Sequence, residues 1–309
     1  MVAVQKMRDV SRRAWWRGRR AWRHAANAIS NAVLRSSTLP RPQPSPDQGR
    51  ASILEATEGL IARWANYRAE TLDQTISQHD DMFEGDLQQY LIAGTSALEV
   101  ISEAMLLARK TRFDNLLDMP CGYGRVTRHL VKFFPDSQIF VSEKDKAKQH
   151  FCASTFGSKG LDLPLDFSGE PTRQFDLIFV GSLLTHLNKH LSISALDYLL
   201  KSLSEGGLLI VTTHGRHATT LTSSPGQLEQ KALQFMRKGF GYEGGSTYGS
   251  SRMTPSWVLR VLESMPDARV LGHKEGGWGC FQDVFVIEKA TGWTWPRPGV
   301  RQIVWQARA

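Results

Sequence analysis

The stretch that begins at Leu116 and reads LLDMPCGYGR constrains the fold of this chain more than any other segment. A short apolar run ends in Asp118, a turn containing Gly122 and Gly124 follows, and an apolar helical pattern comes next. α/β folds use such a strand, tight turn and helix to bring backbone N–H groups close to a ligand. The turn lacks the third glycine of the dinucleotide pattern G-x-G-x-x-G, and an acid at the strand end suits a cationic ligand better than a pyrophosphate.

Further strand patterns follow in the order that an α/β fold requires. Residues 138–143 read as a second strand that ends in Glu143, about one strand–helix unit after the turn. An acid at that position accepts hydrogen bonds from ribose hydroxyls in α/β nucleotide sites. Residues 175–182 and 206–213 read as two later strands, and residues 284–287 read as the last one.

Residues 118–125 resemble the first motif of the class I S-adenosylmethionine-dependent methyltransferases, D/E-x-G-x-G-x-G, with Pro120 at the first glycine. Proline has no N–H, so any hydrogen bond that this glycine would donate is absent. The resemblance extends over about residues 85–290 and implies an α/β fold with a Rossmann-like, seven-stranded, mostly parallel sheet. Helices would cover both faces, and further helices would precede the sheet.

The same resemblance implies S-adenosylmethionine as the cofactor and methyl transfer to a hydroxyl or amine of a small molecule. It places Glu143 on the ribose, with Asp145 as a fallback that suits the N-cap of the next helix better. It also places the end of the third strand at residues 165–167, with Asp166 and Phe167 at the adenine. A loop aspartate followed by a core phenylalanine is an equal alternative there. The cofactor-binding residues implied in this way are Asp118, Pro120, Cys121, Gly122, Gly124, Arg125, Glu143, Lys144, Asp166, Phe167, Gly181 and Ser182.

Two histidines follow strands four and five, where ligands bind in open α/β sheets. A hydroxyl acceptor needs a base near neutral pH, so His186 and His214 are the candidate catalytic residues. A structural role in capping a turn is the alternative for each. The residue types in the sequence do not predict a metal site.

Residues 216–253 read as a long irregular insertion, which predicts an active-site cover or a disordered insert. Phe240, Tyr242 and Tyr248 would form an aromatic wall, and Trp278, Gln282 and Asp283 would lie on the acceptor rim. Segments 121–125, 182–187, 213–215 and 282–284 are together similar to bacterial methyltransferases associated with glycan or lipid-glycan modification. This looser resemblance suggests a sugar or glycan acceptor and identifies none.

The 309 residues divide into a tail (1–50), a helical cap (51–112), a core (113–290) and a C-terminal tail (291–309). The cap pattern predicts helices at 53–69, 86–93 and 96–110, with Ser96 as an N-cap. It also puts Tyr90 and Gly94 near the cofactor mouth, although packing is the favoured sole role for Tyr90.

Charge is concentrated in the tail, since residues 1–50 hold Lys6 and ten arginines against Asp9 and Asp47, whereas the whole chain has a net charge of only +8. Residues 8–36 can form a helix with Trp15 and Trp22 on one face and arginines opposite, which suits peripheral contact with an anionic membrane. The absence of a specific role is at least as well supported as membrane or partner contact, and nucleic-acid contact is less favoured than either. Residues 36–49 carry four prolines and predict a non-helical linker.

Three cysteines without metal or disulfide spacing favour a reducing compartment, so we expect a cytoplasmic protein, with an alternative location at the membrane surface. No run of about 18 apolar residues is evident. Two rival functions remain: a methyltransferase-like scaffold that only binds a partner, and a nicotinamide-dependent oxidoreductase, which the missing third glycine disfavours. The oligomeric state is open.

Overall fold

The computed structural model describes residues 46–245 and 248–293. Its strands are, in chain order, β1 Asn115–Met119, β2 Gln138–Val141, β3 Lys159–Gly160, β4 Phe175–Val180, β5 Leu203–Thr213, β6 Phe240–Gly244, β7 Gly249–Met253, β8 Ala268–Trp278 and β9 Gln282–Lys289. Its helices are α2 Pro46–Asn66, the 3₁₀ turn η1 Ala69–Thr71, α3 Leu87–Ala108, α4 Thr127–Phe133, α5 Lys146–Phe156, α6 Lys189–Lys201, α7 Arg216–Thr222, α8 Pro225–Lys238 and α9 Pro255–Glu263. The basic segment 8–36 lies outside the described residues.

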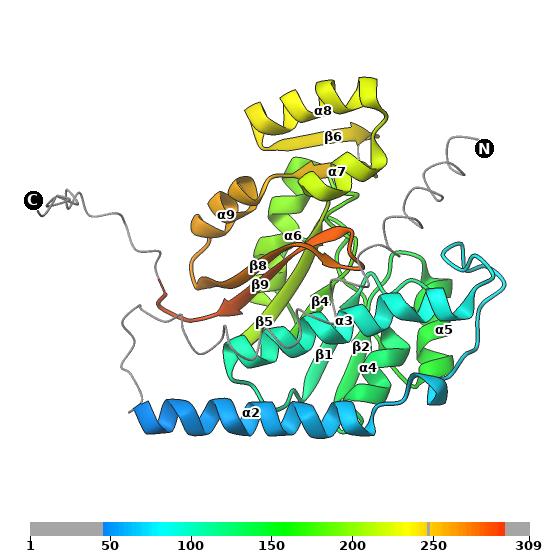
Figure 1. The fold of residues 1–309 in the computed structure, drawn as a ribbon, viewed down its shortest axis with the longest axis vertical. Helices are drawn as coiled ribbons and strands as arrows, with labels where there is room; N and C mark the ends of the chain where they lie inside the picture. Colours follow the sequence, from blue (N-terminus) through cyan, green and yellow to red (C-terminus); the bar gives the residue numbers. More distant parts are fainter. Residues whose placement is uncertain (1–45, 246–247, 294–309) are drawn as a thin grey trace, which may run out of the picture.

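Seven strands form one sheet in the order β3-β2-β1-β4-β5-β9-β8 (Figure 1). β1 to β5 are parallel, whereas β9 runs antiparallel to both β5 and β8. The order reverses beside β1, so the carboxyl ends of β1, β2, β4 and β5 form the crevice edge at which ligands bind in open α/β sheets. The predicted α/β fold with a Rossmann-like, mostly parallel, seven-stranded sheet is confirmed.

Apolar side chains cover both faces of the sheet. α2, α3 and α4 pack on one face through a cluster that includes Leu98, Ile101 and Phe134. α6 and α9 pack on the other face, with Leu199 and Val258 among the buried residues. Because both faces are covered, the strands can be apolar along most of their length, as β4 (FDLIFV) is.

The cap helices differ from the sequence prediction. α2 begins at Pro46, inside the predicted non-helical linker, which is allowed because proline fits the first helical position. α3 is one continuous helix, so the predicted break before Ser96 is wrong. Gly94 interrupts nothing: a Cβ there would lie 2.1 Å from Cδ2 of His129, so this glycine permits close packing of α3 on α4. Its place is therefore in the core rather than at the cofactor mouth.

α3 also has the length and composition of a membrane-spanning helix, the one such helix within the described ranges. Its inner face nevertheless packs in the protein core, where Leu98, Ile101 and Met105 are fully buried. It is therefore a core helix of this fold.

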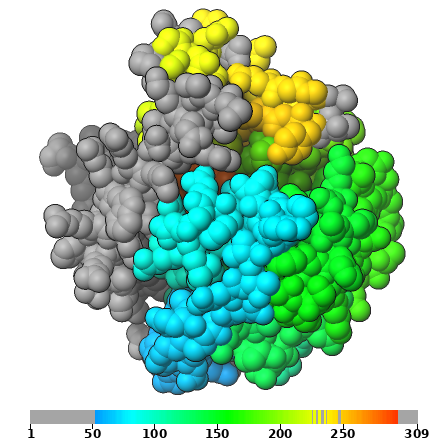
Figure 2. All heavy atoms as spheres, turned by 90° about the vertical axis from the view of Figure 1, so that its right-hand side faces the viewer, coloured from blue at the N-terminus to red at the C-terminus, as the bar shows by residue number. Residues whose placement is uncertain are grey.

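The insertion is wrongly predicted to be irregular. Residues 216–244 and 249–253 form α7, α8 and the antiparallel hairpin β6–β7, which projects from the top of the molecule (Figures 1 and 2). Its glycines end and turn elements: Gly239, with φ of 69°, terminates α8 in the left-handed conformation. Thr254 caps α9, since its side chain accepts a hydrogen bond from the Trp257 N–H.

Candidate functional site

The glycine turn after β1 has two glycines with different tasks. Gly122 and Gly124 both have positive φ, 52° and 78°. A Cβ on Gly124 would lie 2.2 Å from the ring of Phe156, so this glycine is required for packing against α5. A Cβ on Gly122 would meet no atom within 4 Å, so open space lies beside this residue. Of the two, Gly122 is the position where a ligand can approach the backbone.

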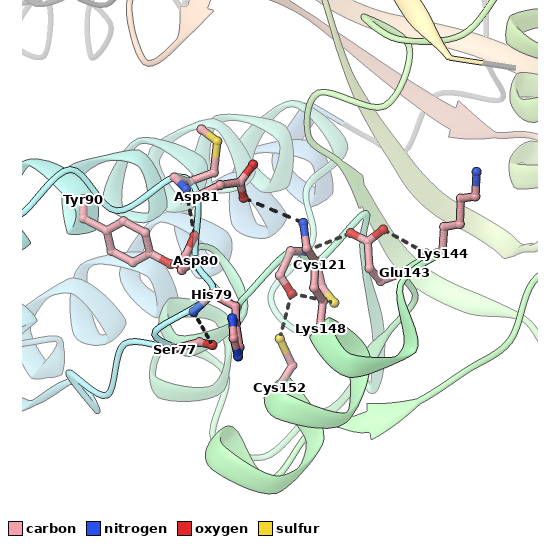
Figure 3. A network of polar contacts seen from close by, with 12 residues as sticks. Ser77, His79, Asp80, Asp81, Tyr90, Cys121, Glu143, Lys144, Lys148 and Cys152 are labelled. Atoms are coloured by element: carbon pink, nitrogen blue, oxygen red, sulfur yellow. Dashed lines mark hydrogen bonds and ion pairs between the residues drawn. The ribbon is translucent and has the colours of Figure 1, made fainter. Parts of the chain in front are cut away.

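Glu143, two residues after β2, faces this turn (Figure 3). Its Oε2 accepts the Gly122 N–H at 3.1 Å, and its Oε1 accepts the Lys144 N–H at 2.8 Å. Each carboxylate oxygen has a second lone pair that can accept a further hydrogen bond. The structure thus brings the predicted ribose-binding acid beside the open glycine, whereas Asp145 caps α5 through the Ala147 N–H.

Asp118 lies on the interior side of the turn. It is almost fully buried, and its Oδ2 accepts a hydrogen bond of 2.6 Å from the Thr127 hydroxyl. Burial raises the pKa of Asp118 to about 7, although the bond from Thr127 opposes the rise. This carboxyl therefore joins β1 to the start of α4, and its bonded oxygen faces protein.

Two thiols hold the carbonyl side of the turn. The Sγ atoms of Cys121 and Cys152 lie 3.4 and 3.3 Å from the Gly122 oxygen and donate to it (Figure 3). Contact with the Cys152 thiol and burial raise the pKa of Cys121 far above its usual range, so this thiol stays protonated. Gly122 is therefore held at its N–H by Glu143 and at its C=O by two thiols, while Pro120 supplies no N–H donor.

The segment between η1 and α3 covers α4 and α5 beside the glycine turn (Figure 2). Arg128 donates to the Asp73 carbonyl at 2.9 Å, and Lys148 pairs with Asp81 at 3.8 Å (Figure 3). Tyr90 donates to Asp80 at 2.6 Å, and burial together with that acid raises the pKa of Tyr90 beyond its usual range. Tyr90 thus anchors the covering segment.

Arg125 follows the glycine turn and extends over the ring of Trp278 at 6.0 Å. Burial lowers the pKa of Arg125, while the neighbouring Tyr90 and Asp80 oppose the change. An arginine remains charged under any such shift, so this guanidinium places a cation inside the crevice wall.

The adenine-side prediction is wrong about the strand. β3 ends at Gly160, so Asp166 and Phe167 lie in the loop beyond it, and the first acid after the strand is Asp162, which pairs with Lys146. Asp166 bonds Ser168 at the surface, and Phe167 packs on Tyr198. A two-residue strand has no apolar pattern by which the sequence could reveal its end.

His186 lies after β4 and is held by the β6–β7 hairpin. Its Nδ1 is 2.9 Å from the Gly249 carbonyl oxygen, and its ring stacks on Tyr248 at 4.6 Å. Since a carbonyl only accepts, Nδ1 carries the hydrogen, and a neutral ring then has its lone pair on Nε2. That is the tautomer a general base requires.

His214 lies after β5, close to His186 and Arg252. Its carbonyl accepts the Met253 N–H at 2.9 Å, and its ring meets Phe281 edge-on at 5.3 Å. Burial lowers the pKa of His214 to about 4, and the nearby His186 and Arg252 contribute to the change in the same direction. The ring is therefore neutral at pH 7.

Ser182, Thr212 and Gln282 form a polar cluster that sequence reasoning did not assemble. The three side chains come from the ends of β4 and β5 and the start of β9, and hydrogen bonds connect them. Gly181 beside them is buried against Trp278. The cluster joins residues up to 100 positions apart, so no local sequence pattern predicts it.

A cavity of about 160 Å³ lies at the opposite edge of the sheet, lined by Lys110, Arg112, Phe113, Asp114, Asp176, Ser204, Glu205 and Gly207. Ligands of open α/β sheets bind at the carboxyl edge instead, so this cavity is not assigned to the chemistry. Throughout 46–245 and 248–293, no three His, Cys, Asp or Glu side chains cluster as metal ligands would.

No protein-family model and no curated protein matches the chain. Solved structures do match it in fold. An O-methyltransferase family protein from Burkholderia thailandensis is 11% identical with a TM-score of 0.44, over 78% of this chain and 73% of that one. An S-adenosylmethionine-bound amino pentose methyltransferase from Micromonospora echinaspora is 12% identical with a TM-score of 0.47, over 64% and 92%. A magnesium protoporphyrin IX methyltransferase from Synechocystis is 11% identical with a TM-score of 0.44, over 79% and 100%. At such identities the likeness concerns the fold alone, and the chemistry has to be argued from the site.

Proposed function

We propose that the chain is an S-adenosylmethionine-dependent methyltransferase that acts on a hydroxyl or amine of a small molecule. The observation that carries the proposal is the open backbone at Gly122 with the Glu143 carboxylate directly beside it, at the carboxyl ends of β1 and β2. This cradle fits the donor, because Glu143 can accept from ribose hydroxyls and Gly122 has no side chain to obstruct them. The bound donor supplies a methyl group activated by a sulfonium.

The chain's own residues then have separable tasks. Glu143 and the glycine turn bind the donor, and the segment from η1 to α3 excludes water from above it. The acceptor has to be held in line with the methyl group, and such positioning contributes up to roughly 7–11 kcal/mol in favourable cases. His186, whose Nδ1 donates to the Gly249 carbonyl, is our candidate for taking a proton from a hydroxyl acceptor at Nε2, and neutral His214 is the second candidate.

Calorimetry separates this function from its rivals. We expect micromolar binding of S-adenosylmethionine and S-adenosylhomocysteine and no binding of NAD. Binding of NAD alone would indicate an oxidoreductase, and binding of none of the three would indicate a scaffold without a cofactor.

Replacing Glu143 with alanine is expected to weaken S-adenosylhomocysteine binding at least tenfold, because the ribose loses its acceptor and Gly122 loses its N–H partner. Glu143→Gln keeps one acceptor oxygen and should lose less affinity. Calorimetry measures both variants, and an unchanged affinity in Glu143→Ala would remove this residue from the ribose role.

Replacing His186 or His214 with alanine is expected to slow turnover by roughly a hundredfold where that histidine is the base. The affinity for S-adenosylhomocysteine should stay within twofold in both variants, because neither ring contacts the glycine turn. Two fully active variants would show that the base lies elsewhere or that none is used.

A sugar or glycan acceptor is the finer proposal. The exposed ring of Tyr248, stacked on His186 beside the acceptor edge, is the kind of surface on which a sugar ring packs. Mass spectrometry of cell extracts incubated with methyl-labelled S-adenosylmethionine would identify the product. We further propose a cytoplasmic protein that contacts anionic membranes through residues 8–36, which cell fractionation with and without that segment would test.

A further inference from the structure

Three residues close a ring of hydrogen bonds at the crevice edge through two side-chain bonds and one backbone N–H. The Ser182 N–H donates to Thr212 Oγ1 at 2.8 Å, and the Thr212 hydroxyl donates to Gln282 Oε1 at 2.6 Å. The Gln282 amide then donates from Nε2 to Ser182 Oγ at 2.7 Å. Each group thus fixes the orientation of the next, which makes the ring more rigid than any one of its bonds.

The ring holds Ser182 in an unfavourable backbone conformation. Its φ is 64°, in the left-handed region that residues with a Cβ rarely adopt and that glycine adopts without strain. The serine side chain therefore has to contribute something that glycine could not. Strained residues of this kind cluster at functional sites.

Only one member of the ring reaches the crevice. Thr212 is fully buried and Gln282 is 8% exposed, whereas Ser182 is half-buried. The Ser182 oxygen accepts from Gln282, so its hydroxyl hydrogen is still available, and it has no acceptor within the described part of the chain. A donor hydrogen is thus presented in a fixed direction where β4 ends.

We propose that Ser182 donates this hydrogen to an oxygen of the methyl acceptor and that Thr212 and Gln282 are positioning residues for it. This role replaces the cofactor contact that the sequence resemblance implies for Ser182. The inference rests on the proposed methyl transfer. A hydrogen bond donated to the attacking atom would withdraw electron density from it and lower its nucleophilicity, so the bonded oxygen is expected to be a neighbour of that atom. The acceptor therefore carries two adjacent polar groups, as a vicinal diol, a hydroxy acid or an amino sugar does.

Three variants separate this role from a structural one. Ser182→Gly removes the hydroxyl and relieves the backbone strain, so it should fold. Gln282→Leu keeps the hydroxyl but removes the side chain that orients it. Cys280→Gly is the matched control, because Cys280 also has a positive φ, 53°, and lies outside the ring.

Calorimetry with S-adenosylhomocysteine measures donor binding in each variant. Transfer of a labelled methyl group from S-adenosylmethionine into a protein-free cell extract, followed as a function of extract concentration, measures acceptor binding. For Ser182→Gly we expect the half-saturating extract concentration to rise at least tenfold while donor affinity stays within twofold. Gln282→Leu should show at least a threefold rise, and Cys280→Gly should match the unmodified protein in both measurements.

Two results would overturn the role of Ser182: saturation of Ser182→Gly at the unmodified protein's extract concentration, or a loss of donor affinity in the same proportion as the loss of transfer. Both leave the proposed function standing. Failure of the unmodified protein to bind S-adenosylhomocysteine would instead overturn the proposed function.

Discussion

Replacing Gly124 with alanine is expected to lower the free energy of unfolding by roughly 3 kcal/mol or more. The backbone there has φ of 78°, which disfavours any Cβ, and the added methyl group would lie 2.2 Å from Cε2 of Phe156. Phe156 cannot easily move away, because it is buried and the Arg128 guanidinium lies over its ring at 4.7 Å. Urea unfolding measures the change, and a loss of less than 1 kcal/mol would contradict the packing argument.

Gly122→Ala is the matched control. Its φ of 52° costs a similar backbone strain of about 1–2 kcal/mol, but the new methyl group meets no atom within 4 Å. This variant should fold and should bind S-adenosylhomocysteine at least tenfold more weakly, because the methyl group occupies the space proposed for the donor. Equal stability losses in the two variants would show that the glycines do not differ in the way the structure indicates.

Acid should destabilise the protein through His129, a fully buried histidine on α4. Its Nδ1 pairs with the Tyr67 hydroxyl at 2.6 Å, while its Nε2 is buried without a partner. Burial, with a smaller contribution from Arg128, lowers the pKa of His129 to about 3 from its ordinary 6.5. Between pH 6.5 and 3 the unfolded chain binds a proton that the folded chain does not, so stability falls by up to about 1.4 kcal/mol per pH unit as pH decreases.

The control is His129→Asn, which offers Tyr67 a hydrogen-bonding partner near the position of Nδ1 and does not titrate. The slope of the free energy of unfolding against pH should be shallower in this variant by close to one proton between pH 6.5 and 4, measured by urea unfolding. Other groups titrate in the same range: the lowered pKa of His214 acts in the same direction, and the raised pKa of Asp118 in the opposite one. Both are present in the two proteins and cancel in the comparison, so equal slopes would refute the contribution of His129.

The central strands could be predicted because their signals are local. β1, β2 and β4 are short apolar runs, and an acid or a glycine marks the end of each one in the sequence. β8 was not predicted, because its sequence, ARVLGHKEGGW, has neither an apolar run nor an alternation of apolar and polar residues. Its residues include buried, half-buried and exposed ones in no regular order. Its place in the sheet depends on pairing with β9, which is a tertiary effect.

Glycine explains the errors in the helices and the insertion. In the sequence, Gly94 looks like a break and the glycines after residue 238 look like an irregular loop. In the structure, Gly94 lets two helices approach, Gly239 ends a helix, and Gly244 turns a hairpin at φ of 150°. The residue type indicates that a side chain is missing, but only the neighbouring atoms show why.

The residues proposed to bind the donor are easier to predict from the sequence than those proposed to bind the acceptor. Gly122 and Glu143 follow the ends of β1 and β2 by three and two residues, so the order of the strands alone brings them together. The orientation of His186 depends on a carbonyl 63 positions away in the hairpin, and the Ser182 ring depends on β9. Hydrogen bonds between residues so far apart in the chain produce no local sequence pattern from which they could be predicted.

The antiparallel direction of β9 decides which of its residues reach the edge of the sheet at which we propose that the acceptor binds. A strand that opposes its neighbours delivers its first residues, rather than its last, to the rim where theirs terminate, so Gln282 arrives beside Ser182 and Thr212. On the proposed role of Ser182, substitutions at the start of β9 are expected to change the preference for the acceptor, although these positions open a strand instead of following one.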